Sequence, residues 1–288
     1  VVMAQTATTG NLENAQKIII AASRYTEEHN APAMALIETF TLPKGSKQVT
    51  VPKVGQMSMT DLVDGQDIID EEEIGMTTVD LTASEVGAKI ILTDKLVRQS
   101  SENVMSIVGR QLGDGMARKK DTDVTALYSG FSTELGAAAR TMSLANVSAV
   151  VAYAKGNRFG SQVYINHHPF AVWDVANTAV TASTTYPVPK GWTEDLLGDF
   201  FSGLRPLNGV PIFEDGNITI DSSDDAVGVI ADKSALAVLK SVETRTERQR
   251  DASLRATELV MTSDYGVFEL DDSKGAALTL DAGTPATS

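Results

Sequence analysis

Apolar and polar residues alternate with a period of two in two stretches of the first third of the chain. Val49 and Val51 alternate with polar residues in "KQVTVPKV". In "TTVDLTASEVGAKIIL" the alternating apolar residues run from Val79 to Leu92. Because this period is typical of a half-buried β-strand, each stretch predicts one strand. Pro52 cannot donate a ladder hydrogen bond, so the first strand is expected at a sheet edge.

A long insertion, "GQMSMTDLVDGQDIIDEEEIGM", separates these two predicted strands and has no clear period. Such an insertion is uncommon in a compact domain and usually forms a projecting functional loop. It carries large apolar side chains that a solvent-exposed loop normally lacks. These are Met57, Met59, Leu62, Val63, Ile68 and Ile69. We expect residues 40–92 to form an extended hairpin whose tip is buried against an adjacent subunit.

The pattern changes to helical spacing after Asn11, which is a suitable N-cap. The apolar residues of this stretch recur on one helix face. They are Leu12, Ala15, Ile18, Ile19, Ala22 and Tyr25. The stripe has no partner nearby in the sequence. It predicts a short amphipathic helix that packs either on the core of its own domain or on a neighbour, through Leu12, Ile18, Ile19 and Ala22.

A second helical stripe lies within residues 100–130, with Ser100 and Ser101 as candidate N-caps. Its members are Val104, Val108, Leu112, Met116, Val124 and Tyr128, and only Lys120 interrupts the series. An unbroken helix here would be about 45 Å long at about 1.5 Å per residue. Each glycine in the stretch costs about 1 kcal/mol relative to alanine, so a break at "GDG" is the alternative.

The segment "MARKKDTDVTALYSGF" places lysines and aspartates together within this predicted helix. Lys119 and Asp123 are four residues apart, and Lys120 and Asp123 are three apart, so both pairs can meet on a helix surface. A reactive lysine needs burial or a cationic neighbour, and nearby carboxylates oppose both effects. The cluster therefore indicates salt bridges on a helix face. Because Lys120 lies on the apolar stripe, the stripe is expected to end there at a subunit or domain boundary.

Short elements alternate after Arg140, which is typical of a mixed α/β unit. "NVSAVVAYAK" and "AVWDVANTA" predict helices, and "SQVYINHHPF" begins as a strand. "AVGVIADKSALAVLKSV" indicates a buried strand running into a helix, and "TASTTYPVPKGWTEDLLGDF" a loop. "PIFEDGNITI" predicts a hairpin with Asp215 and Gly216 at its turn. Further strands are expected over 257–262 and 267–270.

Composition narrows the classes of function. The chain has 288 residues, 42% of them hydrophobic, which is enough for one large core or two modest ones. Its net charge is −14 and its pI is near 4.6, which argues against binding phosphate backbones through a basic surface. The absence of cysteine excludes disulfides, thiolate metal sites and a cysteine nucleophile. The sequence contains no run of 18 apolar residues, so it predicts no membrane-spanning helix. The first residues lack the layout of a signal peptide.

The sequence predicts no catalytic, cofactor or metal site. The histidines are His29, His167 and His168, and adjacent residues of a strand point to opposite faces, so the latter two cannot share a metal. The nucleophile elbow and the glycine-rich nucleotide motifs are absent. The aspartates of "DGNITIDSSDD" lack the spacing of a calcium loop and favour turn chemistry. The acidic run 70–73 is expected to be solvated, with contact to a basic partner as the alternative.

The order of these parts resembles the major capsid protein family of tailed bacteriophages. Residues 81–130 are similar to the passage from the family's extended loop into its long spine helix. The step into the helix reads Thr93, Asp94, Leu96, Val97 and Ser100, and the helix ends with Ala126 to Gly130. "DLVDGQDI" is similar to the family's acidic and glycine-containing loop tip. Looser similarities in "SQVYINHHPFAVWDVAN", "GLRPLNGVPIFED" and "DYGVFELDDSKGAALTL" extend over nearly the whole chain.

This resemblance implies an α+β fold with the parts of a phage capsid subunit. They are an N-terminal arm (1–38), an extended β-hairpin loop or E-loop (39–93), a peripheral domain with the spine helix (94–139), an axial α/β domain (140–240) and the closing strands of the peripheral domain (241–288). No lysine and asparagine pair for the family's covalent cross-link can be placed in this sequence.

The resemblance also implies the function of a structural subunit and not of an enzyme. Copies of the chain would assemble in the host cytoplasm into pentamers and hexamers of the icosahedral head of a virion. The shell would enclose double-stranded DNA without specific binding, and scaffolding, portal and decoration proteins are possible partners. Candidate inter-subunit contacts are Leu12, Ile18, Ile19, Ala22, Met57, Met59, Leu62, Val63, Ile68, Ile69, Lys119, Lys120 and Asp123. The alternatives are the shell protein of an encapsulin nanocompartment and, more distantly, an α/β enzyme.

Overall fold

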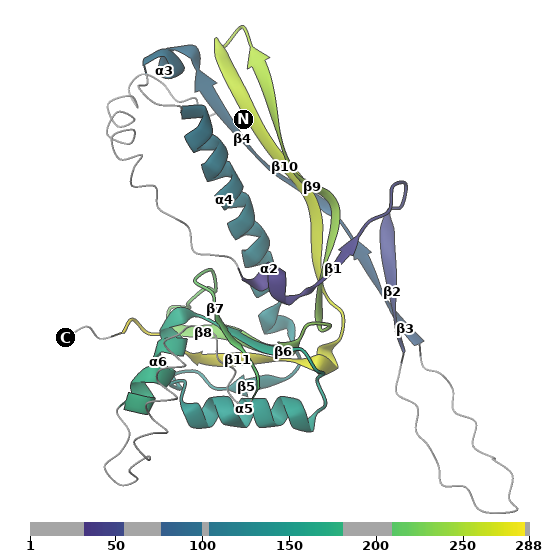
Figure 1. The fold of residues 1–288 in the computed structure, drawn as a ribbon, viewed down its shortest axis with the longest axis vertical. Helices are drawn as coiled ribbons and strands as arrows, with labels where there is room; N and C mark the ends of the chain where they lie inside the picture. Colours follow the sequence, from purple (N-terminus) through teal and green to yellow (C-terminus); the bar gives the residue numbers. More distant parts are fainter. Residues whose placement is uncertain (1–31, 55–75, 100–103, 181–208, 286–288) are drawn as a thin grey trace, which may run out of the picture.

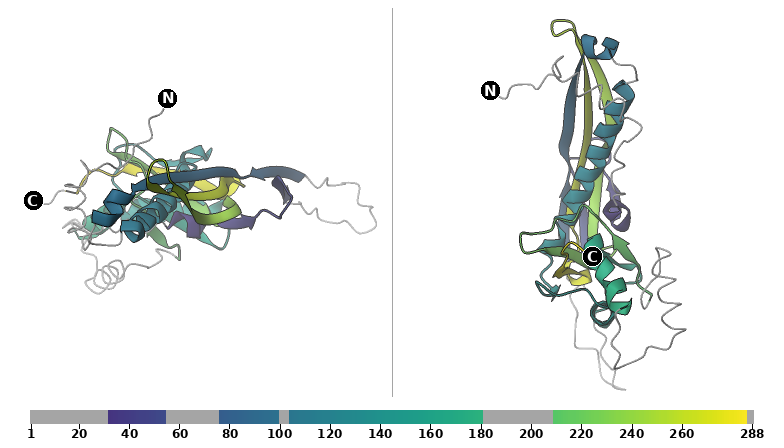
Figure 2. Two further views of the ribbon diagram at one scale, coloured as in Figure 1. Left: turned by 90° about the horizontal axis from the view of Figure 1, so that it is seen from above. Right: turned by 90° about the vertical axis from the view of Figure 1, so that its left-hand side faces the viewer.

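The computed structural model describes residues 32–54, 76–99, 104–180 and 209–285. These residues form an elongated body with a long helix and a narrow sheet at one end and a second, helix-covered sheet at the other (Figure 1). A two-stranded ribbon projects sideways from the junction between the two ends. Figure 2 shows that the body is thin in one direction and that the ribbon extends well beyond it.

The narrow sheet has four strands in the order β1-β9-β10-β4. Their bounds are Glu38–Thr41 for β1, Leu236–Asp251 for β9, Ala256–Glu269 for β10 and Ser84–Thr93 for β4. β1 runs parallel to β9, and the other neighbours are antiparallel. The short helix α2 (Ala33–Leu36) precedes β1 in the sequence, and the short helix α3 (Asp94–Gln99) follows β4.

The long helix α4 (Val104–Thr125) lies along the four-stranded sheet (Figure 1). Its buried side chains Val108, Leu112 and Met116 pack with Leu259 and Met261 of β10. The part of the predicted apolar stripe before Lys120 is therefore the face that contacts the four-stranded sheet. Beyond Lys120 the stripe does not end, because Val124 and Tyr128 lie in the main hydrophobic core. The helix continues without interruption through "GDG", so the alternative of a break there is wrong. After α4 the chain makes one turn of 3-10 helix, η3 (Tyr128–Gly130).

The predicted ribbon consists of β2 (Gln48–Val54) and β3 (Met76–Thr82), which pair in antiparallel fashion. β2 has β3 as its only neighbour among the described strands, in agreement with the edge position inferred from Pro52. The prediction of one continuous strand up to Leu92 is wrong. β3 ends at Thr82, and β4 begins at Ser84 in the other sheet, where it pairs with β10.

The second sheet has five strands in the order β5-β11-β8-β6-β7. Their bounds are Glu134–Gly136 for β5, Gly275–Asp281 for β11, Asp225–Asp232 for β8, Val163–His167 for β6 and Ile212–Glu214 for β7. The helices α5 (Leu144–Gly156) and α6 (Pro169–Val180) lie at this end of the molecule, as the sequence predicts, and η4 (Asp272–Lys274) precedes β11 (Figure 1). The main hydrophobic core lies between this sheet, the helices and the foot of α4.

Three predictions for the C-terminal half are wrong in detail. Residues 236–242 belong to strand β9 and not to a helix, because both β1 and β10 pair with this segment. "PIFEDGNITI" is not a hairpin: β7 pairs with β6 in parallel, and Ile220 makes only an isolated bridge to Ala226. The two strands expected over 257–270 are one strand, β10, which bends through register shifts near Asp264.

Candidate assembly surfaces

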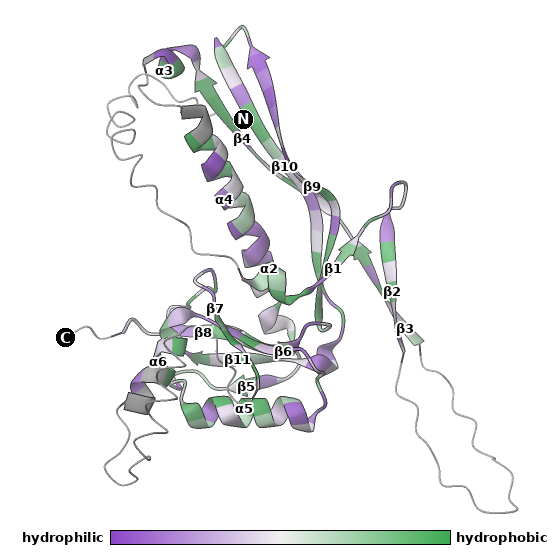
Figure 3. Cartoon of the chain, viewed as in Figure 1, coloured by the Kyte–Doolittle hydropathy of each residue, from purple (hydrophilic) through white to green (hydrophobic). Residues whose placement is uncertain are grey.

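The ribbon has one apolar and one polar face. Val49 lies opposite Leu81, and Val51 opposite Val79, so these four side chains share a face. Leu81 is fully buried, whereas the three valines are half-buried. On the other face the hydroxyl of Thr50 donates a hydrogen bond to the carboxylate of Asp80, which lies directly opposite it. The ribbon therefore offers an apolar face along its length, and Figure 3 shows its apolar residues in green among polar residues in purple on β2 and β3.

The apolar face of the ribbon is only partly covered by the body of its own chain. Val51 and Val79 line an open cleft of about 600 Å³ between the ribbon and the five-stranded end. Arg158, Leu270 and Lys274 line the opposite wall. At the far end of the described ribbon, Met76 is 61% exposed. An exposed methionine beyond a partly open apolar face is typical of a surface that a second molecule covers.

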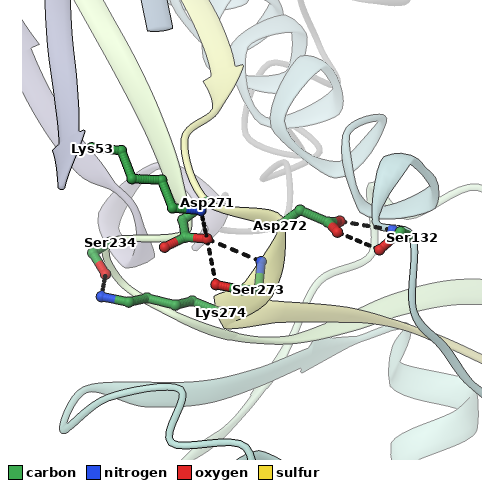
Figure 4. A network of polar contacts seen from close by, with 7 residues as sticks. All are labelled: Lys53, Ser132, Ser234, Asp271, Asp272, Ser273 and Lys274. Atoms are coloured by element: carbon green, nitrogen blue, oxygen red, sulfur yellow. Dashed lines mark hydrogen bonds and ion pairs between the residues drawn. The ribbon is translucent and has the colours of Figure 1, made fainter. Parts of the chain in front are cut away.

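A salt bridge ties the ribbon to the body of its own chain (Figure 4). The ammonium group of Lys53 lies 2.5 Å from Oδ1 of Asp271. That same Oδ1 accepts hydrogen bonds from the backbone N–H and the hydroxyl of Ser273, at 3.0 and 2.6 Å. Burial alone would raise the pKa of Asp271, but the contacts with Lys53 and Ser273 outweigh it and lower the pKa. The aspartate is therefore held in its charged form.

The neighbouring residues extend this anchor to two other elements (Figure 4). Asp272 accepts hydrogen bonds from the backbone N–H and the hydroxyl of Ser132, which follows η3 at the end of α4. Lys274 donates to the hydroxyl of Ser234, in the turn between β8 and β9. The short turn 271–274 thus joins the ribbon, the foot of the long helix and the five-stranded sheet. A change in the direction of the ribbon is therefore expected to alter the contacts of this turn with all three elements.

The lysine and aspartate cluster of α4 makes contacts within its own chain. Lys119 forms the predicted salt bridge with Asp123, at 2.5 Å. Lys120 does not join Asp123 but donates to the hydroxyl of Thr244 at 2.8 Å and lies 5.3 Å from the ring centre of Tyr265. Burial and the charge of Lys240 lower its pKa. The cluster fastens α4 to β9 and β10, and its proposed contact with another subunit stays a prediction.

A buried polar cluster that the sequence analysis missed lies at the foot of α4. Asp121 is fully buried, and its Oδ1 and Oδ2 accept hydrogen bonds from Ala33 N and Asn217 Nδ2, each at 3.0 Å. The hydroxyl of Tyr128 accepts a hydrogen bond from Asn166 Nδ2 at 2.9 Å. The signal was present in the sequence, because Asp121 lies three and seven residues before Val124 and Tyr128 and so shares their helix face.

Two of the three histidines, His167 and His168, are buried in the core, and His29 lies outside the described residues. His167 is fully buried on β6; its Nε2 lies 3.1 Å from the carbonyl oxygen of Leu278, and its Nδ1 accepts from the backbone N–H of His168 at 2.9 Å. Burial lowers the pKa of His167 to about 4, so the ring is neutral and Nε2 donates to Leu278. Asp221 caps a turn, as predicted, because it accepts from the backbone N–H groups of Ser223 and Asp225. Asp215 and Asp225 are buried, so the expectation of solvated turn residues is wrong for these two.

The other candidate contact residues lie outside the described residues. They are Leu12, Ile18, Ile19 and Ala22 of the predicted arm helix, and Met57, Met59, Leu62, Val63, Ile68 and Ile69 of the loop tip. The caps Ser100 and Ser101, the acidic run 70–73 and the loop expected over 181–200 also lie outside.

Within the described ranges no three histidine, aspartate or glutamate side chains are grouped to hold a metal ion. No helix of the same ranges is long and apolar enough to cross a membrane.

The fold defined by this long helix, its two sheets and the projecting ribbon is that of phage capsid proteins. No protein-family model and no curated protein matches the sequence. Solved structures match over most of the chain. The capsid of Ralstonia phage GP4 matches with a TM-score of 0.68 and 12% identity, covering 93% of this chain and 92% of that one. A chain of Mycobacterium phage Che8 matches with a TM-score of 0.63 and 16% identity, covering 81% and 84%.

A third match comes from the acidic stable capsid structure of Helicobacter pylori bacteriophage KHP30. It has a TM-score of 0.69 and 12% identity, and covers 87% of this chain and 89% of that one. The expected α+β fold of a tailed-phage capsid subunit is thereby confirmed. At these identities the likeness concerns the fold, and the function is argued separately below.

Proposed function

We propose that this chain is a major capsid protein, the structural subunit that assembles into the icosahedral head of a virion. The observation that carries this proposal is the correspondence of nearly the whole chain with capsid structures, together with a ribbon whose apolar face is only half covered. An isolated two-stranded ribbon is marginally stable in water, so it must gain burial from elsewhere. A neighbouring copy supplies that burial in a closed shell.

The parts of the chain take the roles that the resemblance implies. Residues 1–38 form an arm, 39–93 the extended loop, 94–139 and 241–288 the peripheral domain with the spine helix α4, and 140–240 the axial domain. Copies assemble into pentamers and hexamers, with scaffolding, portal and decoration proteins as further partners. The strand pairing supports one adjustment, because β1 and β4 belong to the four-stranded sheet, so the projecting part of the loop lies between them.

The charge of the chain suits a shell that encloses DNA without gripping it. The net charge of −14 opposes tight binding to phosphate backbones, so packaged double-stranded DNA would stay mobile against the inner wall. Assembly would take place in the host cytoplasm and end in the virion. The structural role does not call for a catalytic group, which suits a chain whose buried histidine is neutral and held by backbone groups.

Electron microscopy of the purified chain tests the proposal directly. Closed shells or ring-shaped capsomers are expected, and light scattering should report megadalton particles in conditions where assembly is complete. A strictly monomeric species across salt, pH and crowding conditions, with and without a co-expressed scaffold, would overturn the proposal. The contents of isolated shells decide between the two shell functions. Packaged double-stranded DNA supports the phage head, and a packaged enzyme would mark an encapsulin compartment instead.

A further inference from the structure

Two aspartates meet in the buried polar cluster at the foot of α4. Asp121 comes from the helix and Asp215 from the turn after β7, and both are fully buried. Asn217 lies between them: its side-chain amide donates to Oδ2 of Asp121, and its backbone N–H donates to Oδ1 of Asp215 at 2.9 Å. The two carboxyl groups are in direct contact, and this contact is one of the effects that raise the pKa of Asp121.

One oxygen of this pair lacks a donor. Oδ2 of Asp215 is buried and accepts no hydrogen bond from any residue of the described ranges. An ionised carboxylate with an unpaired buried oxygen beside a second carboxylate is unfavourable for two reasons: it is desolvated, and it faces a like charge. One proton shared between this oxygen and the neighbouring carboxyl group of Asp121 removes both penalties, because it supplies the missing hydrogen bond and cancels one of the two like charges.

We propose that Asp121 and Asp215 hold one proton between them in the folded chain, and that this shared proton fixes the foot of α4 to the root of β1 and to the turn after β7. The shared proton lies between Oδ2 of Asp215 and the carboxyl group of Asp121. Asp121 is then held by Ala33, by Asn217 and, through the shared proton, by Asp215. The joint closes when the proton is bound and loosens when it leaves.

The surroundings of the pair favour this proton over a second negative charge. Burial and the contact with Asp215 raise the pKa of Asp121 to about 7, against a hydrogen bond from Asn217 that acts in the opposite direction. The other titratable group that faces the pair is Tyr128 from η3, and burial raises its pKa well above the ordinary value. Tyr128 is therefore neutral over the whole range in which the pair titrates. The element α2 contributes only the backbone N–H of Ala33.

The joint connects three parts of the molecule that are distant in sequence. Ala33 begins α2, which leads from residues 1–31 into strand β1. Asp121 is in the last turn of the long helix, and Asp215 and Asn217 are in the turn that follows the edge strand β7 of the five-stranded sheet. The proton thus controls how firmly α2 is held at Ala33. This inference goes beyond the proposed function and does not depend on shell assembly.

The direction of the pH effect follows from the two states of the pair. In the unfolded chain Asp121 has its ordinary pKa of 3.8, and in the folded chain the pKa is about 7. The stabilisation by the proton is therefore complete below about pH 4, declines as the pH rises, and is lost above about pH 7. For a single proton, the equilibrium constant of unfolding rises by about tenfold per pH unit within this window.

Two isosteric variants test the proposal through the geometry of the pair. In Asp215→Asn the amide nitrogen replaces Oδ2 and donates permanently to Asp121, while the amide oxygen still accepts from Asn217. The unfolding constant of the wild-type chain, divided by that of this variant, should rise by about tenfold per pH unit between pH 5 and 6 and level off above 7. Dividing by the variant cancels the titration of all other groups. A ratio that stays constant from pH 5 to 8 overturns the proposal.

Asp121→Asn is the matched control, because the same change in charge has the wrong geometry there. Its single amide oxygen meets two donors, Ala33 N–H and Asn217 Nδ2, so this variant should be destabilised at every pH and Asp215→Asn should not. Equal behaviour of the two variants contradicts the assignment.

A measurement on the wild-type chain is decisive even if a variant fails to fold. Hydrogen exchange of the Ala33 amide, corrected for its intrinsic pH dependence, should quicken by about tenfold per pH unit up to pH 7; a flat profile overturns the proposal.

Discussion

Lys53 and Asp271 form a salt bridge between residues 218 positions apart in the sequence. Their contact is the point at which the projecting ribbon is tied to the turn between β10 and β11. The lysine side chain is 42% exposed and the aspartate 14%, so water and salt screen the pair only in part. The pair therefore restricts the direction of the ribbon relative to the body. Its contribution to the stability of the fold is the smaller effect.

Loss of this salt bridge should increase the local opening of the ribbon more than it lowers the stability of the whole chain. Lys53→Met keeps the length of the side chain and removes the charge, so it should cost about 0.2–1 kcal/mol in the free energy of unfolding. Hydrogen exchange of residues 48–54 should become faster in the free subunit. Asp271→Ala should cost about 1 kcal/mol more, because it also removes the acceptor of both bonds from Ser273. Unchanged exchange of the ribbon in both variants would contradict the role assigned to the pair.

The pH dependence of this contact runs opposite to that of the buried carboxyl pair. The folded-state pKa of Asp271 lies below its ordinary value of 3.8. Its stabilising contribution is therefore complete above about pH 4 and is lost as the pH falls through the folded-state value. The difference in unfolding free energy between the wild-type chain and Lys53→Met should be constant from pH 5 to 8 and shrink in stronger acid. A difference that grows on acidification would refute this assignment.

Gly266 allows strand β10 to approach the base of the ribbon. A Cβ atom at this position would overlap with the carbonyl oxygen of Thr82 and with the ring of Phe268. Gly266→Ala should therefore destabilise the chain by about 1–3 kcal/mol in denaturant unfolding. Gly109→Ala is the matched control: it lies within α4 and a Cβ there meets no atom within 4 Å, so it should stabilise by about 0.4–1 kcal/mol. Equal effects of the two changes would contradict the close packing at Gly266.

Asp123 should matter more than its salt-bridge partner. Lys119→Ala removes only one exposed pair within a helix, at a cost of about 0.3–0.5 kcal/mol. Asp123→Ala also removes the acceptor of the hydrogen bond from the Tyr265 hydroxyl, which is 2.7 Å long and links α4 to β10. A loss of about 1–3 kcal/mol is expected for this variant in denaturant unfolding. If the two variants lose the same stability, the bond to Tyr265 contributes nothing.

The tip of the extended loop should be needed for assembly and dispensable for folding. Ile68 and Ile69 lie in a segment with several large apolar residues, and burying each of them against a neighbour stabilises by about 1.5–3 kcal/mol. Replacing both with aspartate should abolish stable shells in electron microscopy while the circular dichroism spectrum and unfolding midpoint of the subunit stay unchanged. Shells that form normally from this double variant would disprove the expected contact with an adjacent subunit.

Periodic patterns predicted the elements that are half-buried. The apolar stripe of α4 and the alternation of β2 and β3 are visible in the sequence because each of these elements has one covered and one open face. The strand break at Ala83 was also readable. The apolar positions are odd-numbered up to Ala83 and even-numbered from Val86, which means that the buried side changes.

Fully buried elements were the ones that the sequence could not specify. Leu236 to Leu239 are all fully buried between β1 and β10, and a continuous apolar run carries no period to separate strand from helix. The alanines of this segment favour a helix locally, and the pairing partners that override this preference come from residues near 40 and 265. The contact of Asp121 with Asp215 depends on the same kind of distant pairing, so the local sequence could place Asp121 on the buried face of α4 but could not pair it with Asp215.

The order in which the strands are synthesised has a consequence for when a subunit becomes usable. Both sheets are completed from the end of the chain, because β10 lies between β9 and β4, and β11 lies between β8 and β5. While a ribosome is still translating residues before 256, β4 and β5 lack the only described strands that pair with them. Unfinished or prematurely terminated chains therefore cannot present a completed subunit surface. In the proposed shell, this topology would keep incomplete translation products from joining complete subunits.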